Sequence, residues 1–280
     1  MKARKRFGQH FLAPAWADKV IGAIDPSPGD DFLEIGPGPG VLTSRLAPRV
    51  RSLIAIEIDR DLAADLRPRL PSNTEVVVGD FLDIDLTPFL ARGPLRIAGN
   101  LPYNISSPII FRLLAAAQGL GTGSGTAGLI DATVMLQREV ADRLVARVGT
   151  KDYGVLTIFT ALNADVRRLL TLPPGAFRPA PKVHSAVVRL TFKPSPLPAD
   201  GEAIFDPMVK TMFMQRRKTL LNALGTYAES IGCDTKSVLQ QAEIDPARRP
   251  ETLTQSDLLR LVSVFSSQSP KPKAQSLSPS

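Results

Sequence analysis

Hydrophobic positions in the first half of the chain follow two different spacings. Residues 13–24 carry apolar side chains at helical intervals, which predicts a helix that ends in a proline-containing turn. Beyond it, short apolar runs recur at residues 32–35, 53–58, 76–78, 95–98 and 133–136. Segments suited to helices separate several of these runs, at residues 41–46, 61–70 and 108–117. Strands that alternate with helices predict an α/β fold with a parallel sheet covered on both faces.

The second half of the chain has a different character. The glycine-rich residues 119–128 predict a flexible surface loop, and residues 183–192 alternate in a way that predicts a last strand. Further on, Asp206 and Pro207 suit the start of a helix, and more helical stripes follow. We therefore expect a large domain at residues 1–192, a linker at 193–202, a small all-α domain at 203–265 and a disordered tail at 266–280.

Glycines and an acidic residue follow the ends of the first two apolar runs. Residues 36–40 read Gly-Pro-Gly-Pro-Gly, and Glu57 stands at the end of the second expected strand. In a parallel α/β sheet, ligands bind at the carboxyl ends of the strands. Glycines let a ligand approach the backbone, and a carboxylate can accept hydrogen bonds from two ribose hydroxyls. The arrangement predicts a nucleoside site that includes Gly36 and Glu57.

A nicotinamide or flavin dinucleotide is the main alternative ligand for such a loop. The dinucleotide pattern has its third glycine where Val41 stands, and Pro37 and Pro39 remove two amide donors that would bind pyrophosphate. A nucleoside without phosphates, such as S-adenosylmethionine, does not need them. Asp80 ends the third run, with Phe81 beside it, and is placed to accept from the adenine amine of this cofactor. An aspartate that only caps a turn is the alternative.

The segment Asn100-Leu101-Pro102-Tyr103 follows the fourth run and suits one chemical problem. A purine amino group is a weak nucleophile because its lone pair is delocalised into the ring, and fixed acceptors can draw its hydrogens out of plane. The Asn100 side chain offers one oxygen, and Pro102 restricts Leu101 so that its carbonyl offers another. Tyr103 gives the base a face on which to stack. The segment predicts methylation of a purine amine; the alternative is an ordinary turn with an incidental tyrosine.

A stiff, proline-rich segment at residues 173–181 contains one aromatic residue, Phe177. If this segment faces the cleft, Phe177 could cover the second side of the base held by Tyr103. Otherwise Phe177 belongs to the core.

Composition narrows the class of protein further. The chain has 280 residues, 44% of them hydrophobic, and can bury a full core. A formal net charge of +7 favours an anionic partner, with nucleic acid as the leading candidate. Lys2, Arg4, Lys5 and Arg6 place much of this excess at the start of the chain. The basic residues 216–218 could neutralise RNA phosphates, although a solvated helix face is the usual role of such residues.

Several compartments and cofactor classes are disfavoured by the same composition. The chain has one cysteine, Cys233, and two distant histidines, His10 and His184, which exclude a disulfide and a Cys/His zinc site. No apolar stretch approaches the roughly 20 residues that span a bilayer, and no hydrophobic segment follows the basic N-terminus. We expect a cytoplasmic monomer without a metal or a membrane partner.

The motifs together give the chain a specific resemblance. They are residues 8–12 (Gly-Gln-His-Phe-Leu), 34–38, 57, 79–80, 100–104, 151–154 (Lys-Asp-Tyr-Gly) and 177–185. From about residue 5 to residue 265, the chain resembles the KsgA family of ribosomal RNA small-subunit adenine N6,N6-dimethyltransferases. The resemblance implies a class I, Rossmann-like methyltransferase domain with a seven-stranded, mostly parallel sheet and a small helical domain. It also implies dimethylation of two adjacent adenosines near the 3′ end of 16S ribosomal RNA, inside an immature ribosomal particle.

The same resemblance assigns roles to individual residues. It implies that S-adenosylmethionine contacts His10, Leu12, Gly36, Glu57, Asp80 and Asn100, and that the adenine lies between Tyr103 and Phe177. Most members of the family have Asn where this chain has His10, which puts the detailed contact at that position in question. Residues 119–128 and 266–280 are local additions to the family pattern.

Three other functions share part of this chemistry. A large-subunit ribosomal RNA adenine methyltransferase of the antibiotic-resistance type is the nearest, but residues 151–154 and Asn104 favour the small-subunit family. A DNA adenine methyltransferase usually has a second proline where Leu101 stands. A ribosome-assembly factor whose methylation is secondary is the alternative from a different class.

Overall fold

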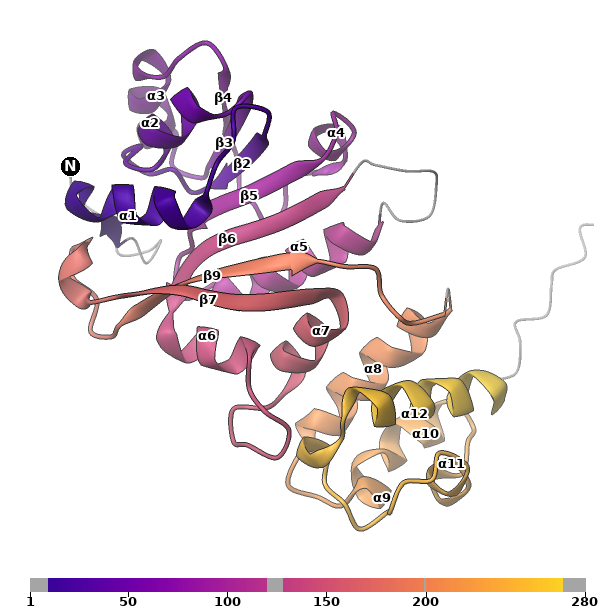
Figure 1. Cartoon of the computed structure of the whole chain (residues 1–280). Coiled ribbons are helices and arrows are strands. Elements are labelled where there is room, and N and C mark those ends of the chain that lie inside the picture. Colours follow the sequence, from indigo (N-terminus) through magenta and orange to yellow (C-terminus); the bar gives the residue numbers. More distant parts are fainter. Residues whose placement is uncertain (1–9, 120–127, 199, 269–280) are drawn as a thin grey trace, which may run out of the picture. The chain divides into compact units, whose positions relative to one another are not determined.

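The computed structural model describes residues 10–119, 128–198 and 200–268, which form two compact units (Figure 1). One unit comprises Met1–Val145 and Phe159–Ser195, and the other comprises Ala146–Ile158 and Pro196–Ser280. The basic N-terminal arm, most of the glycine-rich segment 119–128 and most of the tail expected at 266–280 lie outside the described residues.

The first unit is built on a seven-stranded sheet. Its strands are β2 (Asp31–Ile35), β3 (Ser52–Glu57), β4 (Thr74–Val78), β5 (Leu95–Asn100), β6 (Leu129–Gln137), β7 (Ala164–Leu172) and β9 (Ser185–Phe192). They lie in the order β4-β3-β2-β5-β6-β9-β7. The first five are mutually parallel, whereas β9 is antiparallel to both β6 and β7. The mostly parallel α/β sheet predicted from the sequence is therefore confirmed.

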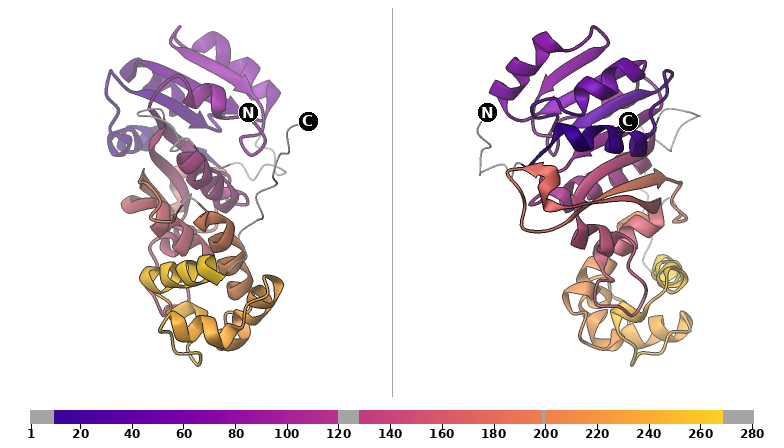
Figure 2. Two further views of the ribbon diagram at one scale, coloured as in Figure 1. Left: turned by 90° about the vertical axis from the view of Figure 1, so that its right-hand side faces the viewer. Right: turned by 60° about the vertical axis from the view of Figure 1, so that its left-hand side comes forward.

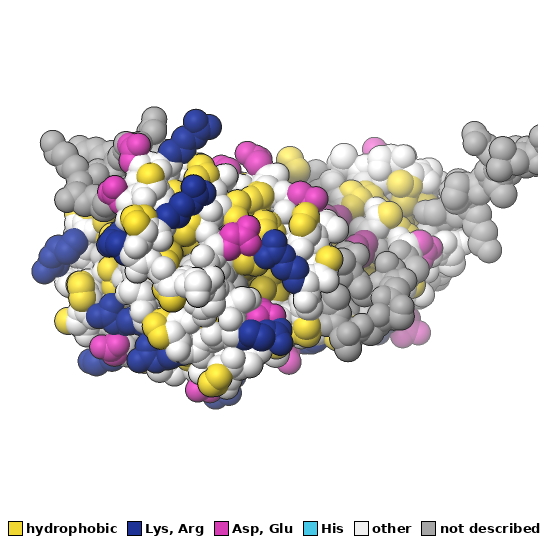
Figure 3. All heavy atoms as spheres, turned by 90° about the horizontal axis from the view of Figure 1, so that it is seen from above, with side chains coloured by type: hydrophobic (Ala, Val, Ile, Leu, Met, Phe, Trp, Pro, Cys, Tyr) yellow, Lys and Arg dark blue, Asp and Glu magenta, His cyan; other side chains and the backbone are white. Residues whose placement is uncertain are grey.

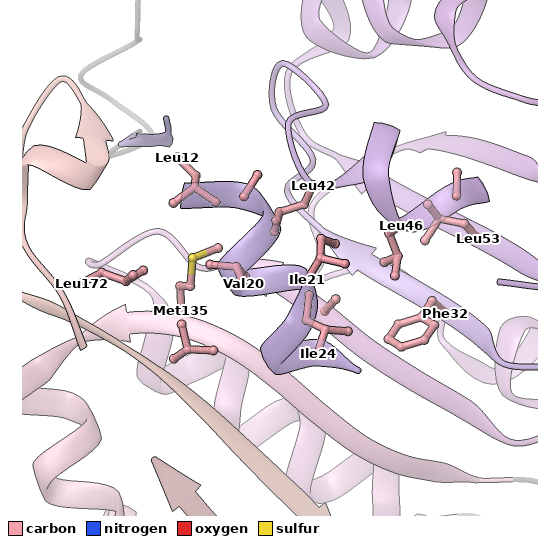
Figure 4. Packing of buried hydrophobic residues seen from close by; sticks show 14 of the residues in the cluster. Leu12, Val20, Ile21, Ile24, Phe32, Leu42, Leu46, Leu53, Met135 and Leu172 are labelled. Atoms are coloured by element: carbon pink, nitrogen blue, oxygen red, sulfur yellow. The ribbon is translucent and has the colours of Figure 1, made fainter. Parts of the chain in front are cut away.

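Helices cover the two faces of this sheet, with α1 in front and α5 behind in the view of Figure 1. The helices of this unit are α1 (Pro14–Ile24), α2 (Thr43–Leu46), α3 (Arg60–Leu66), α4 (Thr87–Leu90), α5 (Ser106–Gly119) and α6 (Arg138–Leu144), with the part of α7 (Val155–Asn163) that begins at Phe159. Short 3₁₀ turns are η2 (Ala47–Arg49), η3 (Arg67–Arg69) and η4 (Pro174–Ala176). Figure 4 shows Val20, Ile21 and Ile24 of α1 directed into a cluster that includes Phe32 and Met135 of the strands beneath. Burial of this stripe fixes α1 on the sheet.

Two arginines satisfy carbonyl groups at the end of α1, which a helix terminus leaves without partners. Arg189 of β9 donates to the carbonyl oxygens of Ala23 and Ile24, each at 2.8 Å, and Arg96 of β5 donates to Ile24 at 3.0 Å. Asp131 of β6 balances both cations, with ion-pair distances of 3.0 Å to Arg96 and 3.7 Å to Arg189. The network ties α1 to the half of β5 remote from Asn100.

A second, two-stranded sheet joins segments that are distant in sequence. β1 (Phe11–Leu12) pairs antiparallel with β8 (Phe177–Arg178), and Leu12 lies opposite Phe177. Ala13 then donates from its backbone amide to the carbonyl oxygen of Ala176 at 2.8 Å. The chain just before α1 is thus held against the proline-rich segment.

The second unit is helical, as Figures 1 and 2 show. Its elements are α8 (Gly201–Met214), α9 (Leu220–Ala223), α10 (Gly225–Ser230), α11 (Thr235–Gln241), η5 (Pro250–Thr252) and α12 (Gln255–Gln268). α8 begins earlier than predicted and contains Pro207 in its interior, because the buried Phe205 extends the apolar stripe toward the N-terminus. α12 continues to Gln268, into the segment expected to be a tail.

Residues 146–158 belong to this helical unit, which differs from the boundary predicted after residue 192. Tyr153 is buried there, and its hydroxyl donates to the carbonyl oxygen of Leu253 at 2.8 Å. The amide of Gly149 donates to the carbonyl oxygen of Glu251 at 2.8 Å. These contacts join residues about a hundred positions apart, so no local pattern indicates them.

Candidate active site

The loop after β2 turns sharply and presents its backbone to β3. Gly36, Gly38 and Gly40 all have positive φ angles, of 65°, 56° and 84°. Residues with a side chain rarely adopt such φ angles. At Gly38, a Cβ would also lie only 3.0 Å from Cε1 of Phe11. The positive φ angles therefore require glycine for the fold of the loop itself.

Glu57 ends β3 and is fixed by this loop. Its Oε2 accepts a hydrogen bond from the amide of Gly38 and its Oε1 accepts from the amide of Asp59, both at 2.9 Å. The side chain is buried, and burial raises the pKa of Glu57 although the two amides oppose the shift. Each carboxylate oxygen still has lone-pair capacity for a ligand donor.

A cleft opens where β2 and β5 end. It is lined by Phe11, Leu12, Glu34, Gly36, Pro37, Pro39, Val41, Leu42 and Asn100. Three predicted site residues, Leu12, Gly36 and Asn100, therefore meet in one place. They come from three segments far apart in sequence, and the parallel pairing of β2 with β5 brings two of them together.

Asn100 is held in one orientation at the edge of this cleft. Its Nδ2 donates to the carbonyl oxygen of His10 at 2.6 Å. Because a carbonyl only accepts, the amide nitrogen must face His10, which turns Oδ1 to the other side. Within the described ranges no group donates to Oδ1. Asn100 thus directs its acceptor oxygen away from His10.

Leu101 and Tyr103 continue this arrangement. The Leu101 side chain is buried, and its amide donates to the carbonyl oxygen of Met135 at 3.0 Å, which anchors the segment to β6. No amide in the described part of the chain donates to the Leu101 carbonyl oxygen. Pro102 begins a turn that leads into α5, and the Tyr103 hydroxyl bonds to Oγ of Ser185 at 2.5 Å. The tyrosine ring is therefore anchored through its hydroxyl to β9.

His10 occupies a place that sequence reasoning did not foresee. Its ring stacks on the ring of Tyr103 with the centroids 5.1 Å apart and the planes at 25°. Its Nδ1 is 2.7 Å from the carbonyl oxygen of Pro179. One residue therefore links the Asn100 amide, the Tyr103 ring and the proline-rich segment.

Phe177 does not cover a base in this structure. Its side chain is 0% exposed and belongs to the core cluster with Leu12, Ala176 and Val187. Pairing of β8 with β1 turns the ring inward, because neighbouring residues of a strand point to opposite sides. The core alternative is the correct one, and the cleft-facing prediction for Phe177 is wrong here.

Asp80 and Phe81 follow β4 in a tight turn. Oδ1 of Asp80 accepts from the amide of Leu82 at 2.9 Å, so the carboxylate does cap a turn, while the residue remains partly exposed. The Phe81 ring is 5% exposed and lies under the guanidinium of Arg112, 5.8 Å from centre to centre. Neither residue lines the cleft described above. Phe81 supports the turn and does not present its face to a ligand.

Glu34 is a cleft residue that sequence reasoning missed. It is 1% exposed, and its Oε2 has no hydrogen-bond partner in the described part of the chain. Burial, reinforced by the Glu57 carboxylate and opposed by the Thr43 side chain, raises the pKa of Glu34 to about 7. The sequence does contain a signal for this residue, because Glu34 is an acid inside the apolar run 32–35. Acids are rarely buried without a partner, so such a position indicates a functional residue.

Residues 10–119, 128–198 and 200–268 contain no group of three or more His, Cys, Asp or Glu side chains placed to bind a metal ion. Within them, every helix is too short or too polar to cross a membrane.

The strand order and the cleft at the strand ends define the class of protein. The chain has a Rossmann-like methyltransferase fold with a C-terminal helical unit. More particularly, it belongs to the ribosomal RNA adenine dimethylase family, whose model matches residues 1–263. The resemblance stated from the motifs is therefore confirmed.

Similar proteins cover nearly the whole chain. Ribosomal RNA small subunit methyltransferase A of Aromatoleum aromaticum is 42% identical over 277 residues, which are 96% of this chain and 97% of the relative. The protein of the same name from Methylibium petroleiphilum is 42% identical over 262 residues, 92% of this chain and 95% of the relative.

Two solved structures share the fold. A dimethyladenosine transferase from Plasmodium falciparum gives a TM-score of 0.72 at 26% identity, covering 92% of this chain and 98% of that one. The 23S rRNA methyltransferase ErmE gives a TM-score of 0.64 at 27% identity, covering 91% of this chain and 99% of that one.

Proposed function

We propose that this chain transfers methyl groups from S-adenosylmethionine to the exocyclic amine of adenosines in small-subunit ribosomal RNA. The observation that carries the proposal is the fixed amide of Asn100 at the glycine-lined cleft. Relatives at 42% identity that carry the name of small-subunit methyltransferases support this choice of RNA over the large subunit.

The cleft, together with Glu57, which binds the glycine loop from the end of β3, fits S-adenosylmethionine. Glu57 has lone pairs left for ribose hydroxyls after binding two amides, and Glu34 has a buried oxygen without a partner beside Gly36. When bound, the cofactor supplies an electrophilic methyl group on a sulfonium. We assign its contacts to His10, Leu12, Gly36, Glu57, Asp80 and Asn100.

The target base is handled by the segment after β5. The adenosine leaves its stack, and Tyr103 offers its ring to the base. Oδ1 of Asn100 and the carbonyl oxygen of Leu101 each accept one amine hydrogen, which returns the lone pair to the nitrogen. No charged base is needed first, because the nitrogen can release its proton after methylation. Holding the amine against the methyl group supplies most of the acceleration.

The stacking place on Tyr103 needs one adjustment. The His10 ring already lies on one face of Tyr103, and Phe177 is in the core. The base therefore either uses the opposite face or displaces the His10 ring. In both cases the His10 carbonyl, which belongs to the backbone, keeps its hydrogen bond to Asn100.

The substrate, in this proposal, is a pair of adjacent adenosines near the 3′ end of 16S ribosomal RNA in an immature particle. The chain acts as a monomer in the cytoplasm, where such particles are assembled. On the face shown in Figure 3, basic side chains are interspersed with acidic ones, so that face offers no single-sign surface for phosphates. Arg217 and Lys218, exposed after α8, are better placed to do so, whereas Arg216 is paired with Glu251 at 2.9 Å.

The test is methyl incorporation into purified, unmethylated small and large ribosomal subunits with labelled S-adenosylmethionine. We expect dimethyladenosine in the small-subunit RNA and background label in the large subunit. Preferential labelling of the large subunit would favour the relatives of the antibiotic-resistance type. Label in neither subunit, from a chain that binds S-adenosylmethionine, would contradict the proposed substrate.

A further inference from the structure

Arg112 of α5 spans two backbone carbonyls of a neighbouring loop. Its Nη1 donates to the carbonyl oxygen of Leu82 and its Nη2 donates to that of Ile84. Its guanidinium also lies over the ring of Phe81, 5.8 Å from the ring centroid. A planar fork of donors suits two carbonyls at once, which the single ammonium of lysine does not.

The loop that Arg112 holds is the turn that presents Asp80. Oδ1 of Asp80 accepts from the amide of Leu82, and the carbonyl oxygen of Asp80 accepts from the amides of Asp83 and Ile84 at 3.0 and 2.9 Å. Leu82 and Ile84 therefore bond to Asp80 through their amides and to Arg112 through their carbonyls. The Asp80 carboxylate is therefore held by a turn in which the guanidinium binds two of the same residues, Leu82 and Ile84.

α5 also begins at the segment that handles the base. Ser106, the first residue of the helix, donates from Oγ to the carbonyl oxygen of Tyr103 at 3.3 Å. Arg112 lies six residues further along α5, about 9 Å at the usual helical rise. One rigid helix thus connects the turn after Tyr103 with the turn that carries Asp80.

A contribution to stability does not by itself explain why an arginine occupies position 112. Its Nε is buried and has no hydrogen-bond partner among the described residues, and an unsatisfied buried donor costs free energy. Arg189 shows the contrast, because it also donates to two backbone carbonyls, through its Nη2 alone, at the end of α1 and remote from the cleft.

We propose that Arg112 is a positioning residue for the cofactor, which aligns Asp80 with the adenine amine. The inference rests on the proposed function, since it takes Asp80 to bind the adenine of S-adenosylmethionine. Arg112 does not touch the cofactor; it acts through the turn formed by residues 80–84.

The experiment measures binding of S-adenosylhomocysteine by calorimetry to the full chain. Arg112→Met removes both donors and keeps an unbranched apolar stem, and we expect it to weaken binding by about tenfold, the usual worth of one charged hydrogen bond. Arg112→Lys, which can serve one carbonyl, should fall between. The matched control, Arg189→Met, removes a similar contact at α1 and should lower the melting temperature without changing affinity.

A double-variant comparison separates positioning from general damage. Asp80→Ala alone should weaken binding about as much as Arg112→Met, and adding Arg112→Met to it should cost less than about twofold more, because both act through one hydrogen bond. In methylation assays, Arg112→Met should raise KM for S-adenosylmethionine while KM for the small subunit stays unchanged.

Several results would overturn the inference. Unchanged affinity in Arg112→Met and Arg112→Lys would do so, as would a full additional loss in the Asp80→Ala background. If Arg112→Met does not fold, Arg112→Lys decides alone, and wild-type affinity in it contradicts the inference. Normal binding by Asp80→Ala would defeat the inference and leave the proposed function standing, whereas no binding by the wild-type chain would defeat both.

Discussion

Glu34 makes stability depend on pH. Its pKa is about 7 in the folded chain, mainly because of burial, against an ordinary value of 4.5. Between these two pH values the folded state binds more protons than the unfolded state. The stabilisation is therefore complete below about pH 4.5 and is lost as the pH rises through about 7.

Replacement of Glu34 by glutamine tests this account. Glu34→Gln keeps a neutral polar side chain, so without ligand it should match wild type at pH 5 and exceed it at pH 8.5. The pKa difference sets a ceiling of roughly 3 kcal/mol on the gain in the free energy of unfolding. Urea unfolding at both pH values measures it. An equal difference between the two proteins at both pH values would show that Glu34 does not titrate in this way.

The position of Phe177 could not be predicted from its local sequence. A phenylalanine among prolines suits a cleft or a core equally well, and the decision depends on pairing between β1 and β8, whose residues are more than 160 positions apart. His10 is similar: its carbonyl binds Asn100 at 2.6 Å, a contact that no side-chain motif describes. Gly36 and Asn100 could be placed together from the sequence because strand ends meet in a parallel sheet, whereas Leu12 was named only through the family resemblance.

At the scale of elements, Gly99 of β5 leaves no room for a side chain beside β2. A Cβ there would lie 2.7 Å from the carbonyl oxygen of Ile35 and 3.2 Å from the Ile35 Cβ, both in the neighbouring strand. The Ile35 backbone cannot move away without separating the two paired strands. Any such movement would also shift Asn100, which directly follows Gly99.

Gly99→Ala should therefore destabilise the chain by about 1–3 kcal/mol and also reduce methyl transfer, because Asn100 shifts with the strand. Gly22→Ala is the matched control: Gly22 is an exposed position of α1, where a Cβ meets nothing within 4 Å. It should leave transfer unchanged and stabilise α1 by up to about 1 kcal/mol. Thermal unfolding and methyl-transfer rates of both variants test this prediction. Wild-type stability and wild-type transfer in Gly99→Ala would contradict the close packing of Gly99 against Ile35.

Some elements could not be predicted from the sequence. β7 lies at the edge of the sheet and carries exposed Arg167 and Arg168 in an irregular pattern with a shifted register, so it lacks the alternation of a half-buried strand. α8 continues through Pro207, which a sequence rule places at the start of a helix. By contrast, β2, β3, β5 and β6 were evident, because strands covered on both faces are apolar throughout.

At the scale of the whole molecule, a formal charge of +7 favours RNA without locating it. Arg217 and Lys218 are exposed at the end of α8, and Arg216 beside them is engaged with Glu251 and with the carbonyl oxygen of Lys151. Only the first two are therefore placed to meet phosphates.

The double variant Arg217→Ala with Lys218→Ala should weaken binding to small subunits. The slope of log affinity against log salt concentration should become shallower by about 1 to 2, as expected for two lost phosphate contacts. Lys236→Ala removes an exposed charge from α11 of the same unit and should change the slope little. Filter binding over a salt series measures all three proteins. A wild-type slope in the double variant would remove these residues from the RNA surface.

The most direct test of the account compares Asn100→Ala with Asn73→Ala. Asn73 also donates from its side chain to backbone carbonyls, those of Ala47 and Val50, but lies outside the cleft lining. Mass spectrometry of small-subunit RNA after incubation with each protein and S-adenosylmethionine gives the rate of dimethyladenosine formation. Loss of the Asn100 acceptor should lower the rate by about 10²–10³-fold while binding to the subunit persists, and Asn73→Ala should remain active. Near-normal methylation by Asn100→Ala would contradict the central claim.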